Sequence, residues 1–184
     1  MLTVFGGLPG TGKTTLARLL ARQQGASYVR VDAIEAGLIE AGLALDQTTV
    51  GNAGYVVANR TAESCLRAGL DVVVDAVNPV EVAREGWRLL GAELDCVLLF
   101  VEVVCSDREQ HRRRVAERQT DLTGWTLPDW QAVLDREYEP WRGERLVIDN
   151  LGDPDIQVEL IAETSARMRA SHDHATKPHT PPSG

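Results

Sequence analysis

The sequence lacks any apolar run long enough to cross a bilayer. Its longest such run, CVLLFVEVVC at positions 96–105, contains Glu102 and is far shorter than the roughly 20 residues that a membrane helix needs. A run of this length is typical of a buried strand. The first residues also lack the basic start and the cleavage site of a signal peptide. We therefore expect a cytoplasmic protein with no membrane partner.

Positive charge and cysteine are also scarce. The chain has 27 acidic residues against 19 lysines and arginines, a net charge of −8. Because nucleic acids and anionic membranes repel an acidic surface, a large binding surface for either is disfavoured. Cys65, Cys96 and Cys105 lack metal-ligand spacing, and free thiols in a reducing compartment are the simplest interpretation. With 184 residues, 43% of them hydrophobic, the composition is that of one soluble globular domain.

Apolar strand-like runs alternate with helical segments along the chain. This pattern predicts an α/β fold with a parallel sheet. The expected strands are 2–5, 28–31, 71–75, 94–104 and 145–148, and the expected helices are 13–24, 33–42, 53–68, 80–90, 107–119, 129–138 and 155–170. Residues 171–184 are rich in proline and almost free of apolar side chains, so we expect a disordered tail there.

Residues 6–15 read GGLPGTGKTT, in which four residues separate Gly7 from Gly12-Lys13-Thr14. Glycines allow the tight turn that aims backbone N–H groups at a phosphate, and the next helix adds its positive N-terminus. Lys13 would contact the β- and γ-phosphates, and the Thr14 hydroxyl would bind Mg²⁺. An apolar run precedes the motif and an amphipathic helix follows it, as a phosphate-binding loop requires. The predicted nucleotide-binding residues are Gly7, Leu8, Pro9, Gly10, Thr11, Gly12, Lys13, Thr14 and Thr15.

Several classes of phosphate-loop protein do not fit the sequence. A GTPase switch normally carries an Asn-Lys-x-Asp motif, which does not occur here. A large motor or an AAA+ ring subunit needs additional length for its lid domain and its arginine-finger interface. A compact single-domain phosphotransferase remains.

The order of four motifs resembles the small P-loop kinases of the adenylate-kinase-like group. The motifs are GLPGTGKTT (7–15), RVDAIEAGL (30–38), VVVDAVNP (72–79) and HRRRVAERQ (111–119). The AAA_33 and zeta-toxin-like subset, with chloramphenicol phosphotransferase, gluconate kinase and the kinase domain of polynucleotide kinase, is most similar. The resemblance covers roughly residues 2–165. It implies a three-layer α/β/α P-loop NTPase fold with a five-stranded parallel sheet, a kinase domain over 1–170 with a small helical lid at about 107–140, and ATP and Mg²⁺ as cofactors.

In this family, a carboxylate after the second strand faces the acceptor hydroxyl, and Asp32 occupies that position. Phosphoryl transfer needs a group that orients the hydroxyl and accepts its proton late, which an aspartate can do. The alternative is that Asp32 only caps the following helix. We expect Asp32 to be catalytic and to contact the acceptor.

Asp75 ends a strand of three valines, in the form of a Walker B carboxylate. It would hold the metal together with Thr14, or it would position the acceptor, with Asn78 in the same pocket. The alternative is a turn residue before Asn78-Pro79, where aspartate is common. The carboxyl ends of adjacent parallel strands are where α/β proteins bind ligands, which favours the functional interpretation.

The basic run from His111 through Arg118 corresponds to the lid of the family. Lid arginines would neutralise charge on the transferring group, together with Lys13. Such a run is often only a solvated helix face, so we expect one or two of these arginines to be functional. The predicted pair is Arg114 and Arg118, which lie one helical turn apart, with Arg112 as the next candidate.

The predicted function is ATP-dependent transfer of the γ-phosphate to a hydroxyl group of a small metabolite or antibiotic. One alternative is a 5′-hydroxyl polynucleotide or nucleotide kinase. In polynucleotide kinases an arginine follows the catalytic aspartate by three residues, but Glu35 stands there in this chain. The alternative from another class is a nucleotide-binding regulatory module without transfer activity.

Overall fold

The computed structural model describes residues 1–176, and the remainder of the predicted disordered tail lies outside these residues. Five parallel strands form one sheet in the order β2-β3-β1-β4-β5. This confirms the predicted sheet. The strands are β1 (Leu2–Gly6), β2 (Ser27–Arg30), β3 (Val72–Asp75), β4 (Leu98–Val104) and β5 (Leu146–Asp149).

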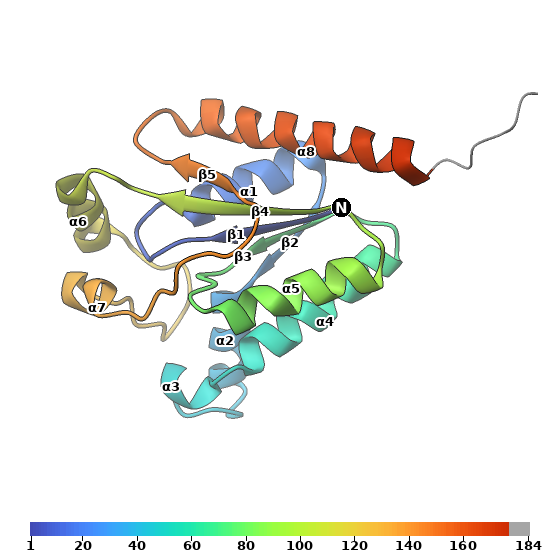
Figure 1. Cartoon of the computed structure of the whole chain (residues 1–184). Coiled ribbons are helices and arrows are strands. Elements are labelled where there is room, and N and C mark those ends of the chain that lie inside the picture. Colours follow the sequence, from blue (N-terminus) through green and yellow to red (C-terminus); the bar gives the residue numbers. More distant parts are fainter. Residues whose placement is uncertain (177–184) are drawn as a thin grey trace, which may run out of the picture.

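Helices cover both faces of the sheet, which gives the expected three layers (Figure 1). One face packs against α1 (Lys13–Gln24) and α8 (Pro154–Thr176), and the other against α4 (Ala53–Arg67) and α5 (Glu81–Glu93). Successive strand side chains point to opposite faces, so Val72 and Val74 join the α4–α5 core while Val73 joins the α1–α8 core. Burial on both faces explains why the strands read as continuous apolar runs.

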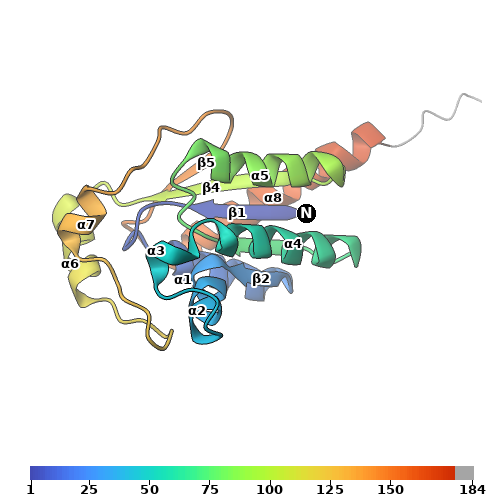
Figure 2. The same ribbon diagram turned by 90° about the horizontal axis from the view of Figure 1, so that it is seen from below.

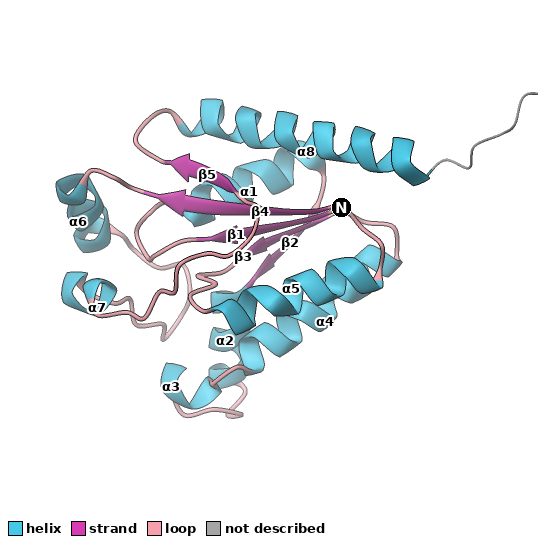
Figure 3. Cartoon of the chain, viewed as in Figure 1, coloured by secondary structure: helices cyan, strands magenta, loops and turns pink. Residues whose placement is uncertain are grey.

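Four shorter helices lie near the carboxyl ends of the strands. They are α2 (Val31–Glu40) and α3 (Gln47–Val50) on one side, and α6 (Arg108–Glu117) and α7 (Trp130–Leu134) in the lid region. Figures 2 and 3 show the strand arrows pointing toward α6 and α7. No described helix has both the length and the apolar content of a membrane span.

The elements differ from the sequence prediction at several boundaries: β4 begins at Leu98 instead of residue 94, and α6 ends at Glu117, so Arg118 lies just outside the helix. Helix α3 was not predicted, because its four residues are too few to show an apolar periodicity; its start is stabilised by the Asp46 side chain, which accepts from the Thr48 and Thr49 backbone N–H groups. Helix α7 ends at Leu134 instead of residue 138. Helix α8 continues to Thr176, so residues 171–176 are helical although their composition predicted disorder.

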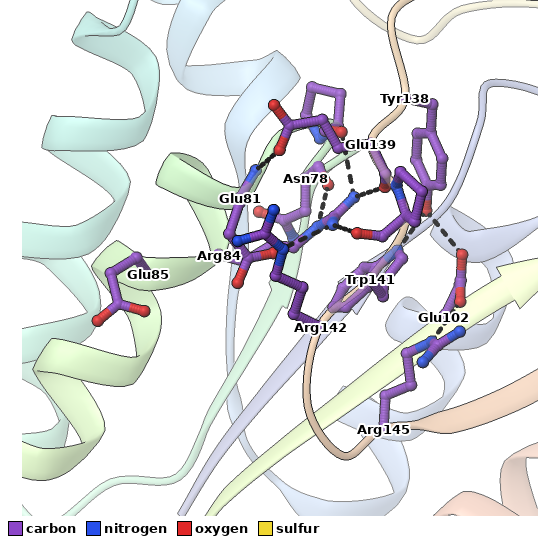
Figure 4. Close-up of polar contacts among 12 residues, drawn as sticks. Asn78, Glu81, Arg84, Glu85, Glu102, Tyr138, Glu139, Trp141, Arg142 and Arg145 are labelled. Atoms are coloured by element: carbon purple, nitrogen blue, oxygen red, sulfur yellow. Dashed lines mark hydrogen bonds and ion pairs between the residues drawn. The ribbon is translucent and has the colours of Figure 1, made fainter.

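A buried arginine of α5 forms hydrogen bonds to both the segment that returns from the lid and the chain after β3 (Figure 4). The Arg84 guanidinium donates to four backbone oxygens, those of Asn78, Pro79, Glu139 and Pro140, at 2.7–3.1 Å. It also lies over the Trp141 ring, 4.2 Å from the ring centroid. Arg84 thereby connects the chain after β3 to the chain after α7.

Candidate active site

The phosphate-binding loop joins β1 to α1 and depends on glycine at two closely packed positions. Gly10 and Gly12 both have positive φ, 86° and 93°. A Cβ at Gly10 would lie 2.4 Å from Val115, and a Cβ at Gly12 would lie 2.0 Å from the Asn150 amide nitrogen. Backbone conformation and space therefore both exclude a side chain at these positions.

Lys13 is the first residue of α1, and only 7% of it is exposed. Within residues 1–176, its ammonium has no hydrogen bond and no ion pair with another side chain. Lysine is seldom buried to this degree without a partner for its charge. The side chain lines a cavity at the positive N-terminus of α1, where an anion would supply the missing partner.

This cavity has a volume of about 890 Å³ and lies between the phosphate-binding loop, α2 and the lid. Of the predicted loop residues, Pro9, Gly10, Gly12, Lys13, Thr14 and Thr15 line it. Gly7, Leu8 and Thr11 do not line it. Thr11 is buried and its hydroxyl donates to the Leu8 carbonyl oxygen at 2.9 Å, so it shapes the loop from inside.

Asp32 lies in the first turn of α2 and lines the same cavity. The N-cap residue of α2 is Arg30, and Asp32 follows it in the first turn, which argues against the alternative of a helix cap. The nearest cation is Arg30, whose Nη2 lies 3.8 Å from Asp32 Oδ2, too far for a hydrogen bond. Among the described residues, the carboxylate has no hydrogen-bond donor and is therefore open to a ligand.

Asp75 is the last residue of β3, opposite Phe5 of β1 and Arg30 of β2 in the sheet. It is buried, and its Oδ2 accepts a 2.7 Å hydrogen bond from the Tyr28 hydroxyl. Burial and the Asp75 charge raise the pKa of Tyr28, so the phenol remains a donor. Tyr28 thereby fixes one carboxylate oxygen, a contact between strands that the sequence did not predict.

Thr14 and Asp75 were predicted to hold a magnesium ion. The Thr14 hydroxyl lines the cavity and has no hydrogen bond within the part of the chain that the structure describes. The Oδ1 atom of Asp75 likewise accepts none there, but Asp75 is buried and does not line the cavity. A free hydroxyl and a carboxylate oxygen are hard oxygen donors, which fits Mg²⁺ bound jointly by protein, phosphates and water. The described residues contain no cluster of three or more His, Cys, Asp or Glu side chains able to hold a metal alone.

The geometry argues against the predicted substrate contact of Asn78. This residue is fully buried and does not line the cavity. Its Nδ2 donates to the Phe5 carbonyl at 2.8 Å, and its Oδ1 accepts from Trp87 Nε1 at 3.0 Å. Both side-chain atoms are therefore used inside the core, where Asn78 supports the turn after β3 with a φ of 50°.

The lid helix α6 lies against the phosphate-binding loop. His111 is buried, with its Nε2 2.8 Å from the Pro9 carbonyl oxygen, and its ring meets the edge of Trp130. Arg114 and Arg118 line the cavity, as predicted, whereas Arg112 and Arg113 are exposed and do not.

The two cavity arginines of the lid are held by backbone oxygens. Arg114 donates to the Asn150 carbonyl at 2.7 Å, and Arg118 donates to the Pro128 carbonyl at 2.8 Å. Burial lowers the pKa of Arg118, and its Nε is buried without a hydrogen-bond partner in the described chain. An anion in the cavity would relieve this desolvation.

Sequence reasoning missed several polar residues that line the cavity. Arg18, Arg30, Asp121, Arg136 and Asn150 come from five different segments of the chain. Asn150 is buried, its Nδ2 donates to the Thr11 carbonyl at 2.8 Å, and its Oδ1 has no partner in the described chain. No motif joins these residues, so only the fold reveals them.

Glu35, one turn after Asp32 on α2, is a second carboxylate in the cavity. Its side chain packs against Gly54 of α4, where a Cβ would lie 2.3 Å from Glu35 Cγ. Burial first, and then repulsion by Asp32, raise the pKa of Glu35 from 4.5 to about 7. The acceptor side therefore contains a carboxyl group that changes charge near neutral pH.

This shift predicts a pH-dependent stability. Between pH 4.5 and about 7 the folded protein retains a proton that the unfolded chain has released, so the free energy of unfolding falls as the pH rises. Glu35→Gln removes this dependence. Between pH 4 and pH 8, the free energy of unfolding of the variant should rise by about 1–2 kcal/mol relative to that of wild type. This value is reduced because Glu35 is only partly buried. Urea unfolding at both pH values measures it.

Glu40→Gln is the matched control, because Glu40 is an exposed glutamate of the same helix. Equal pH profiles for all three proteins would contradict a raised pKa of Glu35.

Comparisons with known proteins identify the family and the fold. No curated protein matches the sequence significantly. The *Mycobacterium tuberculosis* APS kinase CysC, in complex with AMPPNP and APS, is similar in structure with a TM-score of 0.65 and 20% identity, covering 90% of this chain and 96% of that one. A gluconokinase from Sinorhizobium meliloti 1021 has a TM-score of 0.65 and 19% sequence identity, and the match covers 95% of this chain and 97% of that one. Kti12 of Chaetomium thermophilum, in complex with ADP-AlF3, has a TM-score of 0.61 and 18% sequence identity, and the match covers 91% of this chain and 98% of that one.

At these identities the structural likeness shows the fold alone. The family is shown by the sequence profile of the AAA domain (AAA_33), which matches residues 2–136, well over half of the chain. The chain therefore belongs to the AAA domain family and has the fold of the small P-loop kinases.

Proposed function

We propose that the protein is a cytoplasmic, ATP- and Mg²⁺-dependent kinase that phosphorylates a hydroxyl group of a small molecule. The observation that carries this proposal is the presence of two incompletely partnered groups in one cavity. Within the described chain, the ammonium of the largely buried Lys13 has no hydrogen bond or ion pair, and the Asp32 carboxylate, 3.8 Å from Arg30, accepts no hydrogen bond. A triphosphate would supply the first and an acceptor hydroxyl the second.

Each group has a defined task in this proposal. Lys13 and the N-terminus of α1 bind the phosphates, while Asp32 orients the acceptor hydroxyl and accepts its proton as the new bond to phosphorus forms. Arg114 and Arg118 neutralise the charge on the transferring group and help to exclude water. Mg²⁺, held by Thr14 and by Asp75 directly or through water, would offset phosphate charge.

The solved relatives support a nucleotide and a small acceptor. The APS kinase structure contains a nucleotide analogue together with APS, and another similar structure is a gluconokinase.

The acceptor side also favours a small molecule over a polynucleotide. Glu35 lines the cavity where an arginine would serve an anionic nucleic-acid end, and the net charge of the chain is −8. Both features oppose the binding of a polyanion.

A screen of hydroxylated metabolites and antibiotics tests the proposal. Each compound is incubated with the protein, ATP and Mg²⁺, and mass spectrometry detects the gain of one phosphoryl group. We expect a gain with at least one acceptor, and its loss with Lys13→Ala or after chelation of the metal by EDTA. A 5′-hydroxyl oligonucleotide is included as a further acceptor.

Two outcomes would contradict the proposal. Phosphorylation of the oligonucleotide alone would identify a polynucleotide kinase. Tight ATP binding without phosphorylation of any acceptor would instead favour a nucleotide-binding regulatory module.

A further inference from the structure

One carboxylate of the lid reaches the body of the protein at two points. Asp121, in the loop between α6 and α7, accepts from Arg30 Nη1 at 2.6 Å and from Arg18 Nη2 at 3.1 Å. Arg30 ends β2 and Arg18 lies on α1. The lid is thereby connected to two elements that carry the site.

Arg30 lies between two carboxylates. Its Nη1 is hydrogen-bonded to Asp121, while its Nη2 lies 3.8 Å from Asp32 Oδ2. Only 11% of the Arg30 side chain is exposed, and its Nε is buried without a partner in the described chain. A third carboxylate, Asp75, lies opposite Arg30 in the sheet, but the structure shows no ion pair between them, so Asp121 and Asp32 are the carboxylates that Arg30 contacts. A shift of about 1 Å would turn the contact with Asp32 into a charge-assisted hydrogen bond.

We propose that Asp121 is a positioning residue that holds Arg30 off Asp32. With Asp121 in place, the Asp32 oxygens remain free to accept the hydrogen bond, and then the proton, of the acceptor hydroxyl. Without Asp121, Arg30 turns to Asp32 and occupies it. This inference rests on the proposed function, because it assigns a purpose to keeping Asp32 free.

This arrangement couples Asp32, the proposed catalytic base, to the position of the lid. Asp121 belongs to the lid segment, so the lid must lie against β2 before Arg30 is withdrawn from Asp32. While the lid is away, Arg30 blocks the base. Asp32 then cannot activate a water molecule beside the nucleotide, which limits wasteful ATP hydrolysis.

The kinetics of two substitutions distinguish positioning of Arg30 by Asp121 from a purely structural role in which Asp121 only attaches the lid to the rest of the protein. Asp121→Asn should lower kcat about 10-fold and change KM for ATP and acceptor less than about 3-fold. Adding Arg30→Gln to Asp121→Asn should restore most of the lost kcat, because no guanidinium is left to occupy Asp32. If Asp121 only fastens the lid, Arg30→Gln adds to the loss or leaves it unchanged, which would overturn the proposal.

Arg18→Gln is the comparison variant, since it removes the other partner of Asp121 but leaves the 2.6 Å contact with Arg30. Because Arg18 itself lines the cavity, the double variant is the readout: adding Arg30→Gln to Arg18→Gln should restore no kcat, since Asp121 still holds Arg30. A recovery of kcat as large as in the Asp121→Asn background would overturn the proposal.

A measurement without catalysis keeps this proposal separate from the proposed function. In ¹⁵N spectra of arginine side chains, the Arg30 guanidinium signals of Asp121→Asn should shift when Asp32→Asn is added. In wild type, Asp32→Asn should shift them much less. This pattern would support the exchange of partners even if no acceptor is phosphorylated. Equal responses in the two backgrounds would overturn it.

Discussion

Asp32→Asn should bind ATP as wild type does and lower kcat for phosphoryl transfer at least ~10²-fold. The amide has the size of the carboxylate but cannot accept the proton of the acceptor hydroxyl. Nucleotide binding should persist, because in the proposed function the Lys13 ammonium and the loop backbone would bind the phosphates, and neither contacts Asp32 through a hydrogen bond. Arg30 should also keep its place, since its 2.6 Å partner is Asp121.

Equilibrium titration with ATP and steady-state kinetics measure the two quantities separately. Asp95→Asn is the matched control: Asp95 is exposed, follows α5 at the opposite end of the sheet, and has a φ of 45° that asparagine tolerates. The control should leave kcat unchanged. Unaltered turnover in Asp32→Asn would remove Asp32 from the mechanism, and joint loss of ATP binding would indicate a structural role instead.

The donor half of the site could be predicted from the sequence because its information is local. The loop from Gly7 to Thr15 is one continuous stretch, and the flanking strand and helix give the context in which it binds phosphate. The sheet was predictable for a similar reason, since strands buried on both faces are continuous apolar runs such as Val72–Asp75. These features depend on neighbours in the chain.

The acceptor half depends on contacts between distant segments, and the prediction was weaker there. Tyr28 is paired with Asp75, and Arg30 with Asp121, across 47 and 91 residues. Nothing in either local sequence identifies the partner. Asn78 shows the converse: it lies directly after a strand end that faces the site, but its positive φ turns its side chain into the core.

The lid was located but its attachment was not predicted. The basic run HRRRVAERQ indicated a helix near the phosphates, and helical spacing selected Arg114 and Arg118 over their neighbours. The buried contact of His111 with Pro9 has no such periodic signal. Arg84 likewise resembled an ordinary surface arginine of an amphipathic helix, although it is fully buried.

Arg84→Met should destabilise the protein by about 3–5 kcal/mol. Methionine fills similar space but donates nothing, so the carbonyl oxygens of Asn78, Glu139 and Pro140 lose their guanidinium donor, while Pro79 keeps the 2.8 Å hydrogen bond from the Glu139 N–H. It also removes the cation stacked on Trp141 and the 3.3 Å ion pair with Glu81. For a chain of this size, thermal unfolding should shift downward by roughly 10 °C.

Arg88→Met tests whether the loss of stability in Arg84→Met comes from the fully buried position of the guanidinium or from its charge alone. Arg88 lies one turn further along α5 and pairs with Glu81 and Glu85 at 2.7 and 2.9 Å, but 28% of its side chain remains exposed. Its loss should cost only about 1 kcal/mol. Similar costs for the two variants would contradict a special role for the buried guanidinium.

The loss of stability in Arg84→Met should also be distributed unevenly over the structure. Its acceptors lie in two segments, Asn78–Pro79 after β3 and Glu139–Pro140 on the return from the lid, so removing the guanidinium weakens the attachment of the return segment, which keeps the hydrogen bonds from the Glu139 N–H to Pro79 and from Arg88 to the Arg142 carbonyl. Amide hydrogen exchange should accelerate first in residues 137–145, at temperatures where the sheet is still protected. Because Arg84 does not line the cavity, kcat should fall only where this segment opens. A uniform rise in exchange over the whole chain would instead show that Arg84 stabilises the fold without controlling the lid.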